Sequence, residues 1–117
     1  MILEIADITI GAGKNVEFEE AIERGVREVI QNAKGFLGFH IQKGIESPNR
    51  YILMIQWQTL ENHTVDFRES PAFAVWRGIV GPYFEKPPSV EHFSLLANSV
   101  AQGFEGCKGS KGFLAID

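Results

Sequence analysis

A histidine and several aromatic residues lie close together in the stretch HTVDFRESPAFAVW, residues 63–76. The imidazole of His63 has an ordinary pKa of about 6.5, which suits proton abstraction near neutral pH. Phe67 follows one helical turn later and would share a helix face with His63. The stretch is therefore a candidate pocket wall that carries a general base. A histidine in the first turn of a helix can equally anchor that helix through a backbone carbonyl or simply meet solvent.

Three further aromatic residues, Phe73, Trp76 and Tyr83, are candidates for the same wall. At helical spacing such residues more often belong to a hydrophobic core. The hydroxyl of Tyr83 could donate to an oxyanion or to the backbone. Arg77, next to Trp76, could hold an anionic substrate or pair with Asp7.

Asp7 is the unusual residue of the first apolar segment. It shares one alternating face with Leu3 and Ile5, and a carboxylate among aliphatic side chains is costly unless it is paired or protonated. It is either a second base whose pKa is raised by burial or a structural partner of an arginine such as Arg77. The alternation does not say whether this face meets helices or another sheet.

Composition excludes several classes of protein. A chain of 117 residues fits one domain with a sizeable core, and its net charge of -4, with no dense Lys/Arg face, argues against nucleic-acid binding. Cys107 has no second cysteine for a disulfide or a zinc site and fits a reducing cytoplasm. The start MILEIADITI is too short and too acidic for a signal peptide or a membrane span. GxGxxG, HxxxH and CxxC motifs for a flavin or metal are missing.

Hydrophobic periodicity predicts four strands and two helical segments, the second of which is divided by Ser70-Pro71. In chain order, we expect a strand over 2–10, a helix over 15–35 with Asn15 as N-cap, strands over 36–44 and 50–58, helices over 60–69 and 71–80, and a strand over 89–96. This βαββαβ order predicts an α+β, ferredoxin-like fold: a four-stranded antiparallel sheet with helices on one face. His40 and His92 would then lie on opposite edge strands and would not meet.

The strands carry apolar residues on both faces, yet no predicted helix remains to cover the second face. An uncovered apolar patch of that size is unusual on a monomer. We therefore expect a homodimer that packs sheet to sheet through a two-fold axis and forms an α+β barrel. Residues 97–117 form a glycine-rich tail, which is either a loose end or an ordered arm beyond the domain of residues 1–96.

The sequence resembles the antibiotic biosynthesis monooxygenase family of dimeric α+β barrel proteins. The residues that carry the resemblance are GFLGFHIQKG, YILMIQWQTLENH, His63 followed by SPAFAVW, and PSVEHFSL, within residues 1–96. The family includes cofactor-free oxygenases of aromatic polyketides and quinols, haem-degrading enzymes and members of other function. The haem-degrading branch is expected to have Asn, Trp and His where this chain has Asp7, Phe67 and Arg77. Arginine does not ligate iron at neutral pH, so the resemblance does not favour haem degradation.

The resemblance implies a cofactor-independent monooxygenase that acts on a small aromatic, anthrone or quinol-like substrate, and the N-terminal sequence makes the cytoplasm the expected compartment. His63 or Asp7 would remove a proton, Arg77 or Tyr83 would hold the resulting anion, and Phe67, Phe73 and Trp76 would line the chamber. Two alternatives remain, namely a small-molecule binding or stress-related protein without catalysis, and a cofactor-free isomerase.

Overall fold

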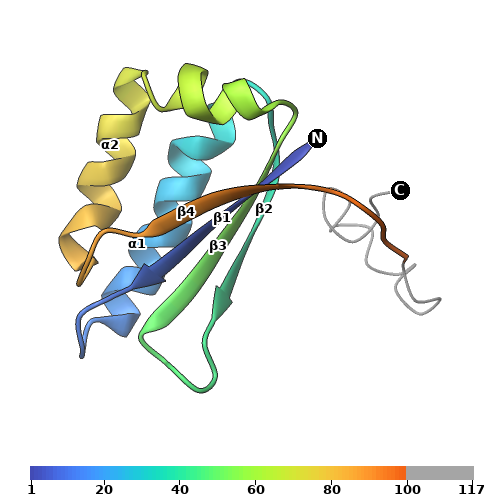
Figure 1. Cartoon of the computed structure of the whole chain (residues 1–117). Helices are drawn as coiled ribbons and strands as arrows, with labels where there is room; N and C mark the ends of the chain where they lie inside the picture. The colour runs from blue at the N-terminus through green and yellow to red at the C-terminus, as the bar shows by residue number, and fades with distance from the viewer. Residues whose placement is uncertain (100–117) are drawn as a thin grey trace.

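The computed structural model describes residues 1–99 and confirms the ferredoxin-like α+β fold (Figure 1). A single antiparallel sheet has the strand order β2-β3-β1-β4. Its strands are β1 (Ile2–Thr9), β2 (Phe36–Lys43), β3 (Arg50–Trp57) and β4 (Ser89–Ser94). Both main helices lie on the same face of this sheet. The predicted tail lies outside the described residues from position 100 onward.

Helix α1 (Asn15–Glu28) packs on the sheet through one apolar stripe, as its periodicity predicts. The residues buried along this stripe are Phe18, Ala21, Ile22, Gly25 and Val26. The predicted end of the helix at residue 35 is wrong, because a short 3₁₀ turn (Ile30–Asn32) follows α1 and Gly35 then adopts a φ of 85°. This left-handed conformation is one that glycine adopts without strain.

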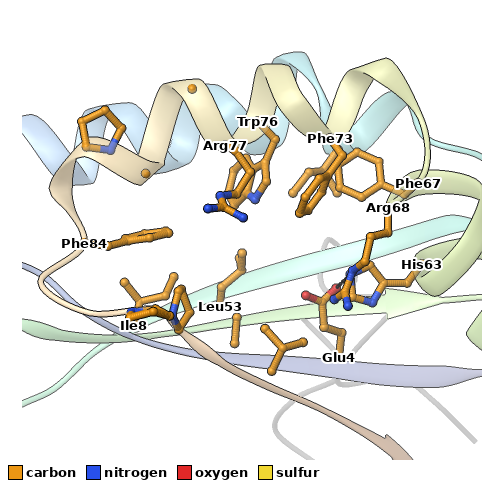
Figure 2. A pocket seen from close by; sticks show the side chains of 18 of the residues that line it. Glu4, Ile8, Leu53, His63, Phe67, Arg68, Phe73, Trp76, Arg77 and Phe84 are labelled. Atoms are coloured by element: carbon orange, nitrogen blue, oxygen red, sulfur yellow. Dashed lines mark ion pairs between the residues drawn. The ribbon is translucent and has the colours of Figure 1, made fainter.

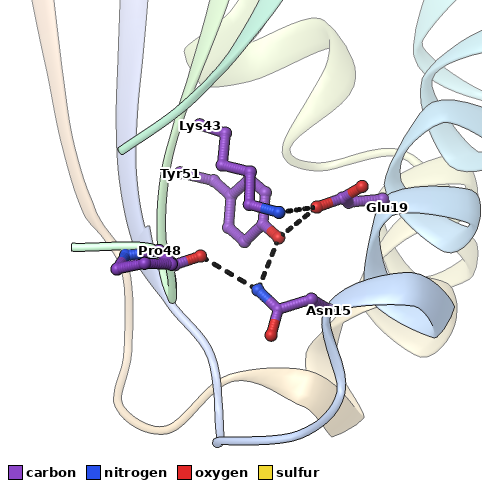
Figure 3. A network of polar contacts seen from close by, with 5 residues as sticks. All are labelled: Asn15, Glu19, Lys43, Pro48 and Tyr51. Atoms are coloured by element: carbon purple, nitrogen blue, oxygen red, sulfur yellow. Dashed lines mark hydrogen bonds and ion pairs between the residues drawn. The ribbon is translucent and has the colours of Figure 1, made fainter. Parts of the chain in front are cut away.

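The predicted N-cap of α1 is also wrong. Lys14 occupies the N-cap position, and no side chain caps the helix. The amide of Asn15 instead donates to the carbonyl oxygen of Pro48 and to the hydroxyl of Tyr51, both at 2.9 Å (Figure 3). The Tyr51 hydroxyl in turn donates to Glu19 at 2.6 Å. Asn15 therefore ties the start of α1 to β3 and to the turn before it.

The segment after β3 becomes helical at residue 60, as predicted, and the Thr59 hydroxyl accepts a hydrogen bond from the backbone N–H of Asn62 at 3.2 Å. It then forms a π-helix (η2, Asn62–Phe67) instead of the expected α-helix. The Arg68 N–H donates to the His63 carbonyl five residues earlier, at 3.0 Å. Such π turns are rare and often occur at functional sites.

Helix α2 (Pro71–Val80) starts at the Ser-Pro pair, as expected. The Ser70 hydroxyl donates to the Phe67 carbonyl at 2.7 Å instead of capping α2. The chain therefore turns between η2 and α2, and the two segments meet the sheet at different points (Figure 1). A short 3₁₀ turn (η3, Gly81–Tyr83) then leads towards β4.

The hydrophobic core lies between the sheet and the two helices. The even-numbered residues of β1 from Glu4 to Ile8 are buried on this side, as are Tyr51, Leu53, Ile55 and Trp57 of β3. The odd-numbered residues of β1 point to the opposite, open face, which no helix covers within residues 1–99 (Figure 1). Within these residues, no helix has the length and apolar content to cross a bilayer.

Candidate functional site

A cavity of about 940 Å³ lies between α2 and the sheet (Figure 2). Its floor is formed by β1, β3 and β4, and its roof by the inward side of α2. The segment after η3, which includes Phe84 and Lys86, closes one end, while η2 closes the other. The volume is in the range of pockets that bind small organic molecules.

Aromatic rings form most of the roof near η2. Phe67 and Phe73 pack edge to face with their centroids 5.7 Å apart, and Trp76 points into the cavity beside them. His63 and Arg77 line the same cavity. The structure therefore brings five of the residues proposed from the sequence to one chamber: His63, Phe67, Phe73, Trp76 and Arg77.

Glu4 lies on the floor of the cavity, although it is only 6% exposed. The indole N–H of Trp57 donates to its Oε1 at 2.9 Å, and Nε2 of His63 lies 3.5 Å from the same oxygen (Figure 2). Burial raises the pKa of Glu4 to about 7, and the Trp57 hydrogen bond and the positive charge of Arg68 only partly oppose this. A buried carboxyl that titrates near neutral pH can accept or release a proton there.

His63 lies between Glu4 and a second histidine. Its Nδ1 is 2.7 Å from Nε2 of His92, so one of the two rings donates a hydrogen bond to the other. The His63 ring also stacks on Trp57, with their centroids 5.4 Å apart. Burial, with the charges of Arg68 and His92, lowers the pKa of His63 to about 4. His63 is therefore neutral at pH 7.

His92 also has a pKa below its usual value, because it is partly buried and lies near the positive charge of Arg68. The expectation that His40 and His92 do not meet is confirmed, because β2 and β4 are the two edges of the sheet. His92 instead contacts His63 from the segment that follows β3. Among residues 1–99, no cluster of His, Cys, Asp and Glu has an arrangement that could hold a metal ion.

Two arginines give the cavity positive charge, and the charge of Arg68 acts on Glu4. The guanidinium groups of Arg68 and Arg77 lie 6.0 and 5.8 Å from the centroid of the Phe73 ring. Both side chains line the cavity, Arg68 from the residue after η2 and Arg77 from α2 (Figure 2). An anion formed by deprotonation of a molecule bound in the cavity would therefore have two cationic partners in the same chamber.

Asp7 lies on the open face of the sheet, away from the cavity. Its carboxylate accepts two hydrogen bonds from Arg50, at 2.9 and 2.6 Å, and so its arginine partner is Arg50, not Arg77. The hydrogen bond from Arg50 holds the pKa of Asp7 below its usual value, which corrects the expectation that burial raises it. The structure therefore supports the structural alternative for Asp7.

Tyr83 also lies outside the group that lines the cavity. Its ring packs edge to face on Phe18 of α1, with the centroids 5.9 Å apart. The next residue, Phe84, lines the cavity instead. The aromatic wall therefore includes Phe84 where the sequence interpretation had placed Tyr83.

Glu4 and Arg68, which the sequence interpretation missed, line the cavity, and His92, which it placed on an edge strand, joins them through His63. For Glu4 a signal was present, because it alternates with Ala6 and Ile8 on the more apolar side of β1. A lone carboxylate on a buried strand face is a recognised sign of a functional group. The contact of His92 with His63 depends on tertiary structure and has no local signal.

Comparisons with known proteins agree with this fold. Residues 1–78 match the family model described as antibiotic biosynthesis monooxygenase. The uncharacterized protein YczJ of Bacillus subtilis is 34% identical over 93 residues, which cover 80% of this chain and 97% of YczJ. A structure from Bordetella bronchiseptica, described as a candidate antibiotic biosynthesis monooxygenase, is 38% identical with a TM-score of 0.77 and covers 82% of this chain and 97% of its own.

A more distant structure has the same fold. It is a monooxygenase of Streptomyces coelicolor solved with the ligand nanaomycin D, and it is 18% identical to this chain with a TM-score of 0.73. The matched region covers 86% of this chain and 92% of that protein.

Proposed function

This chain belongs to the antibiotic biosynthesis monooxygenase family, and we propose that it oxidises a small aromatic substrate of the anthrone or quinol type with O₂ and without a cofactor. The observation that carries this proposal is the aromatic cavity that contains Glu4, with its pKa of about 7, and two arginines. The family assignment supports a monooxygenase-like activity in general. The substrate class and the roles of single residues are our proposal.

The proposed reaction needs no external reductant. Loss of a proton turns an anthrone or quinol into an electron-rich anion that transfers an electron to O₂, and the two radicals combine to a peroxide. For an anthrone, loss of water from the peroxide converts the CH₂ group to a carbonyl. One oxygen atom enters the product and the other leaves as water. The substrate supplies all four electrons that reduce O₂.

Each step has a counterpart among the residues of the cavity. The Glu4–His63 pair receives the proton at the η2 end of the cavity. Arg68 and Arg77 stabilise the anion. The rings of Phe67, Phe73 and Trp76 provide an apolar enclosure that limits the access of water to the peroxide.

We also propose that the chain acts as a homodimer joined through the open face of the sheet. Phe93 of edge strand β4 is 45% exposed on this face, opposite Leu3 of β1. Burial of such apolar groups against a second copy would stabilise the assembly by about 25 cal/mol for each Å² removed from water.

Oxygen consumption tests the proposed activity. Purified protein is mixed with 1,8-dihydroxyanthrone or with substituted hydroquinones, and O₂ uptake is compared with the rate in buffer. We expect catalysed uptake with at least one compound. We expect Arg77→Met to lower kcat/KM by about 10-fold or more, because it removes charge stabilisation of the anion. Arg24→Met, at an exposed position on α1, serves as the matched control and should leave the rate unchanged.

Uptake at the buffer rate with every compound would contradict the proposal. Binding that quenches tryptophan fluorescence without O₂ uptake would then indicate a binding protein. Conversion of the probe in the absence of O₂ would indicate an isomerase.

A further inference from the structure

We propose that Glu4 is the catalytic base of this cavity and that His63 is a positioning residue that holds the Glu4 carboxylate. The inference rests on the proposed function and names the group that receives the substrate proton. Neither the family match nor the sequence interpretation assigns a role to Glu4.

The position of Glu4 follows from the register of the sheet. On β1 it pairs with Ile55 of β3 on one side and with His92 of β4 on the other. Its side chain therefore rises from the middle of the sheet into the space below α2, where it lines the cavity (Figure 2). Proton transfer requires a base whose position is fixed. A side chain on a central strand keeps its position better than one on a loop.

The contacts of the carboxylate leave one oxygen for the substrate. Both the Trp57 indole N–H, at 2.9 Å, and Nε2 of His63, at 3.5 Å, approach Oε1. These two contacts orient the carboxylate, and Oε2 is then the oxygen that can accept a proton from a bound molecule. When it does, an O–H or C–H bond of the substrate breaks, Oε2 gains the proton, and the electron pair stays on the substrate.

His63 is poorly suited to be the base itself. Its Nδ1 is engaged with His92 at 2.7 Å, and its Nε2 is directed towards Glu4. Its pKa of about 4 also makes it a weak base, whereas a general base works best with a pKa near the working pH. Glu4 has such a pKa, and its geometry leaves an oxygen accessible from the cavity.

Charged and titratable groups approach Glu4 from every element packed around it. His92 comes from β4, and His63 and Arg68 come from η2 and the residue after it, while Arg77 of α2 lines the same cavity. Across the sheet, β3 contributes the uncharged Trp57. The positive charge of Arg68 partly lowers the pKa of Glu4 and is also available to the anion once Glu4 has taken the proton.

The test compares Glu4→Gln with the wild-type protein in O₂ uptake with 1,8-dihydroxyanthrone from pH 5 to 9. The amide oxygen of Gln can still accept the Trp57 hydrogen bond, so the substitution removes the base with little change in shape. We expect the wild-type kcat/KM to rise about 10-fold per pH unit below pH 7 and to level off above it. Glu4→Gln should lower kcat/KM by about 10²-fold or more and should remove this pH step, the rise of kcat/KM up to pH 7.

Two control variants separate the roles. Glu46→Gln changes an exposed carboxyl in the turn between β2 and β3 and should keep both the wild-type rate and the pH step. His63→Gln should lower the rate less than Glu4→Gln and keep a pH step, displaced from its wild-type position. Formate should partly restore the activity of Glu4→Ala, because a small carboxylate can occupy the space that the side chain leaves.

The outcomes distinguish this inference from the proposed function. Absence of uptake by the wild-type protein with every probe overturns the proposed function, and the role of Glu4 in it. Uptake by the wild type, together with an unchanged rate or pH step in Glu4→Gln, overturns only the assignment of Glu4. A measurement without substrate adds to this: the NMR signal of the Trp57 indole N–H should titrate near pH 7 in the wild type. An indole signal that does not change between pH 6 and 8 would also overturn the assignment.

Discussion

Burial shifts the pKa values of Glu4 and His63, the two groups at the centre of the site, in opposite directions. It raises the pKa of Glu4 from 4.5 to about 7 and lowers the pKa of His63 from 6.5 to about 4. Each shift favours the neutral form, because an apolar environment disfavours charge of either sign. Between about pH 4 and 7 both groups are therefore neutral, and above pH 7 Glu4 carries a negative charge inside the protein.

These shifts predict how stability depends on pH. Glu4 binds its proton more tightly in the folded state, so its contribution is complete below pH 4.5 and is lost as pH rises to about 7. His63 has the opposite sign: its contribution is complete above pH 6.5 and is lost as pH falls to about 4. In the wild type, the loss of stability from Glu4 and the gain from His63 largely cancel as the pH rises from 4.5 to 6.5.

Glu4→Gln should remove the first effect and leave the second. We expect the free energy of unfolding of Glu4→Gln, relative to the wild type, to rise by about 3 kcal/mol from pH 4.5 to pH 8. Urea unfolding followed by tryptophan fluorescence, at a fixed protein concentration, measures this difference. Glu46→Gln is the control, because it removes the same charge from an exposed position in the turn between β2 and β3. A difference for Glu4→Gln that stays constant with pH would show that Glu4 is not a buried group with a raised pKa.

At the scale of the elements, local sequence patterns predicted the strands and helices well because each has a clear periodicity. The π-helix of η2 was not predicted, because the same short sequence can form an α-helix or a π-helix. Tertiary contacts decide between the two conformations. In η2 one such contact is that of the His63 ring with Glu4 and His92. Another is that of Asn62 with Gly35, where the space is so small that an added Cβ would lie 2.0 Å from Oδ1 of Asn62.

The candidate site could be predicted only in part for the same reason. His63, Phe67 and Trp76 lie on one continuous stretch, so their proximity is visible in the sequence. Glu4 is 59 residues from His63, and His92 is 29 residues beyond it. Their contacts depend on the strand order of the sheet, which places β4 beside β1. Asp7 was expected in the site but lies outside it. The burial pattern of β1 places it on the open face, and its sequence neighbours do not reveal this.

Two helical glycines provide a test of how α1 and α2 pack together. A Cβ on Gly25 of α1 would lie 2.9 Å from the Trp76 ring, whereas a Cβ on Gly78 of α2 would meet nothing within 4 Å. Gly78→Ala should stabilise the protein by about 0.5–1 kcal/mol, because alanine is the better helix former. Gly25→Ala should be less stable than Gly78→Ala by about 1–3 kcal/mol, because the methyl group displaces Trp76.

Thermal or urea unfolding of the two variants measures this difference. The fluorescence of Gly25→Ala should also change, since Trp76 forms part of the cavity roof. Equal stabilisation by both substitutions would show that α1 and α2 can separate at no cost. Trp76 would then not be held in place by α1.

The open face of the sheet carries apolar side chains, as the interface of a protein dimer does. Besides Phe93, it carries the partly buried side chains of Leu3, Ile5, Ile52 and Met54. Gln56 lies on the same side of β3, and its Oε1 is buried without a hydrogen-bond partner among the described residues. An unpaired buried acceptor is costly, and a donor from a second copy could satisfy it.

A lysine on this face tests the proposed dimer. Ile5 pairs with Met54 and Glu91 across the sheet, so Ile5→Lys introduces a charge opposite a carboxylate and should preserve the fold. In the proposed dimer the same charge would lie at the interface and would be costly to bury. At micromolar concentration we expect light scattering to give about twice the 13.1 kDa chain mass for the wild type and about one chain mass for Ile5→Lys.

Ile45→Lys is the matched control, because Ile45 lies in a loop and is almost fully exposed, and it should keep the wild-type mass. A wild-type mass of 13.1 kDa would contradict the dimer directly. The same variant then addresses function, since Glu4 and Ile5 are neighbours on β1 that point to opposite faces of the sheet. If the interface fixes β1 and thereby the position of Glu4, Ile5→Lys should lose O₂ uptake together with the dimer. Retention of uptake by monomeric Ile5→Lys would show that one protomer is sufficient to hold the cavity in its active form.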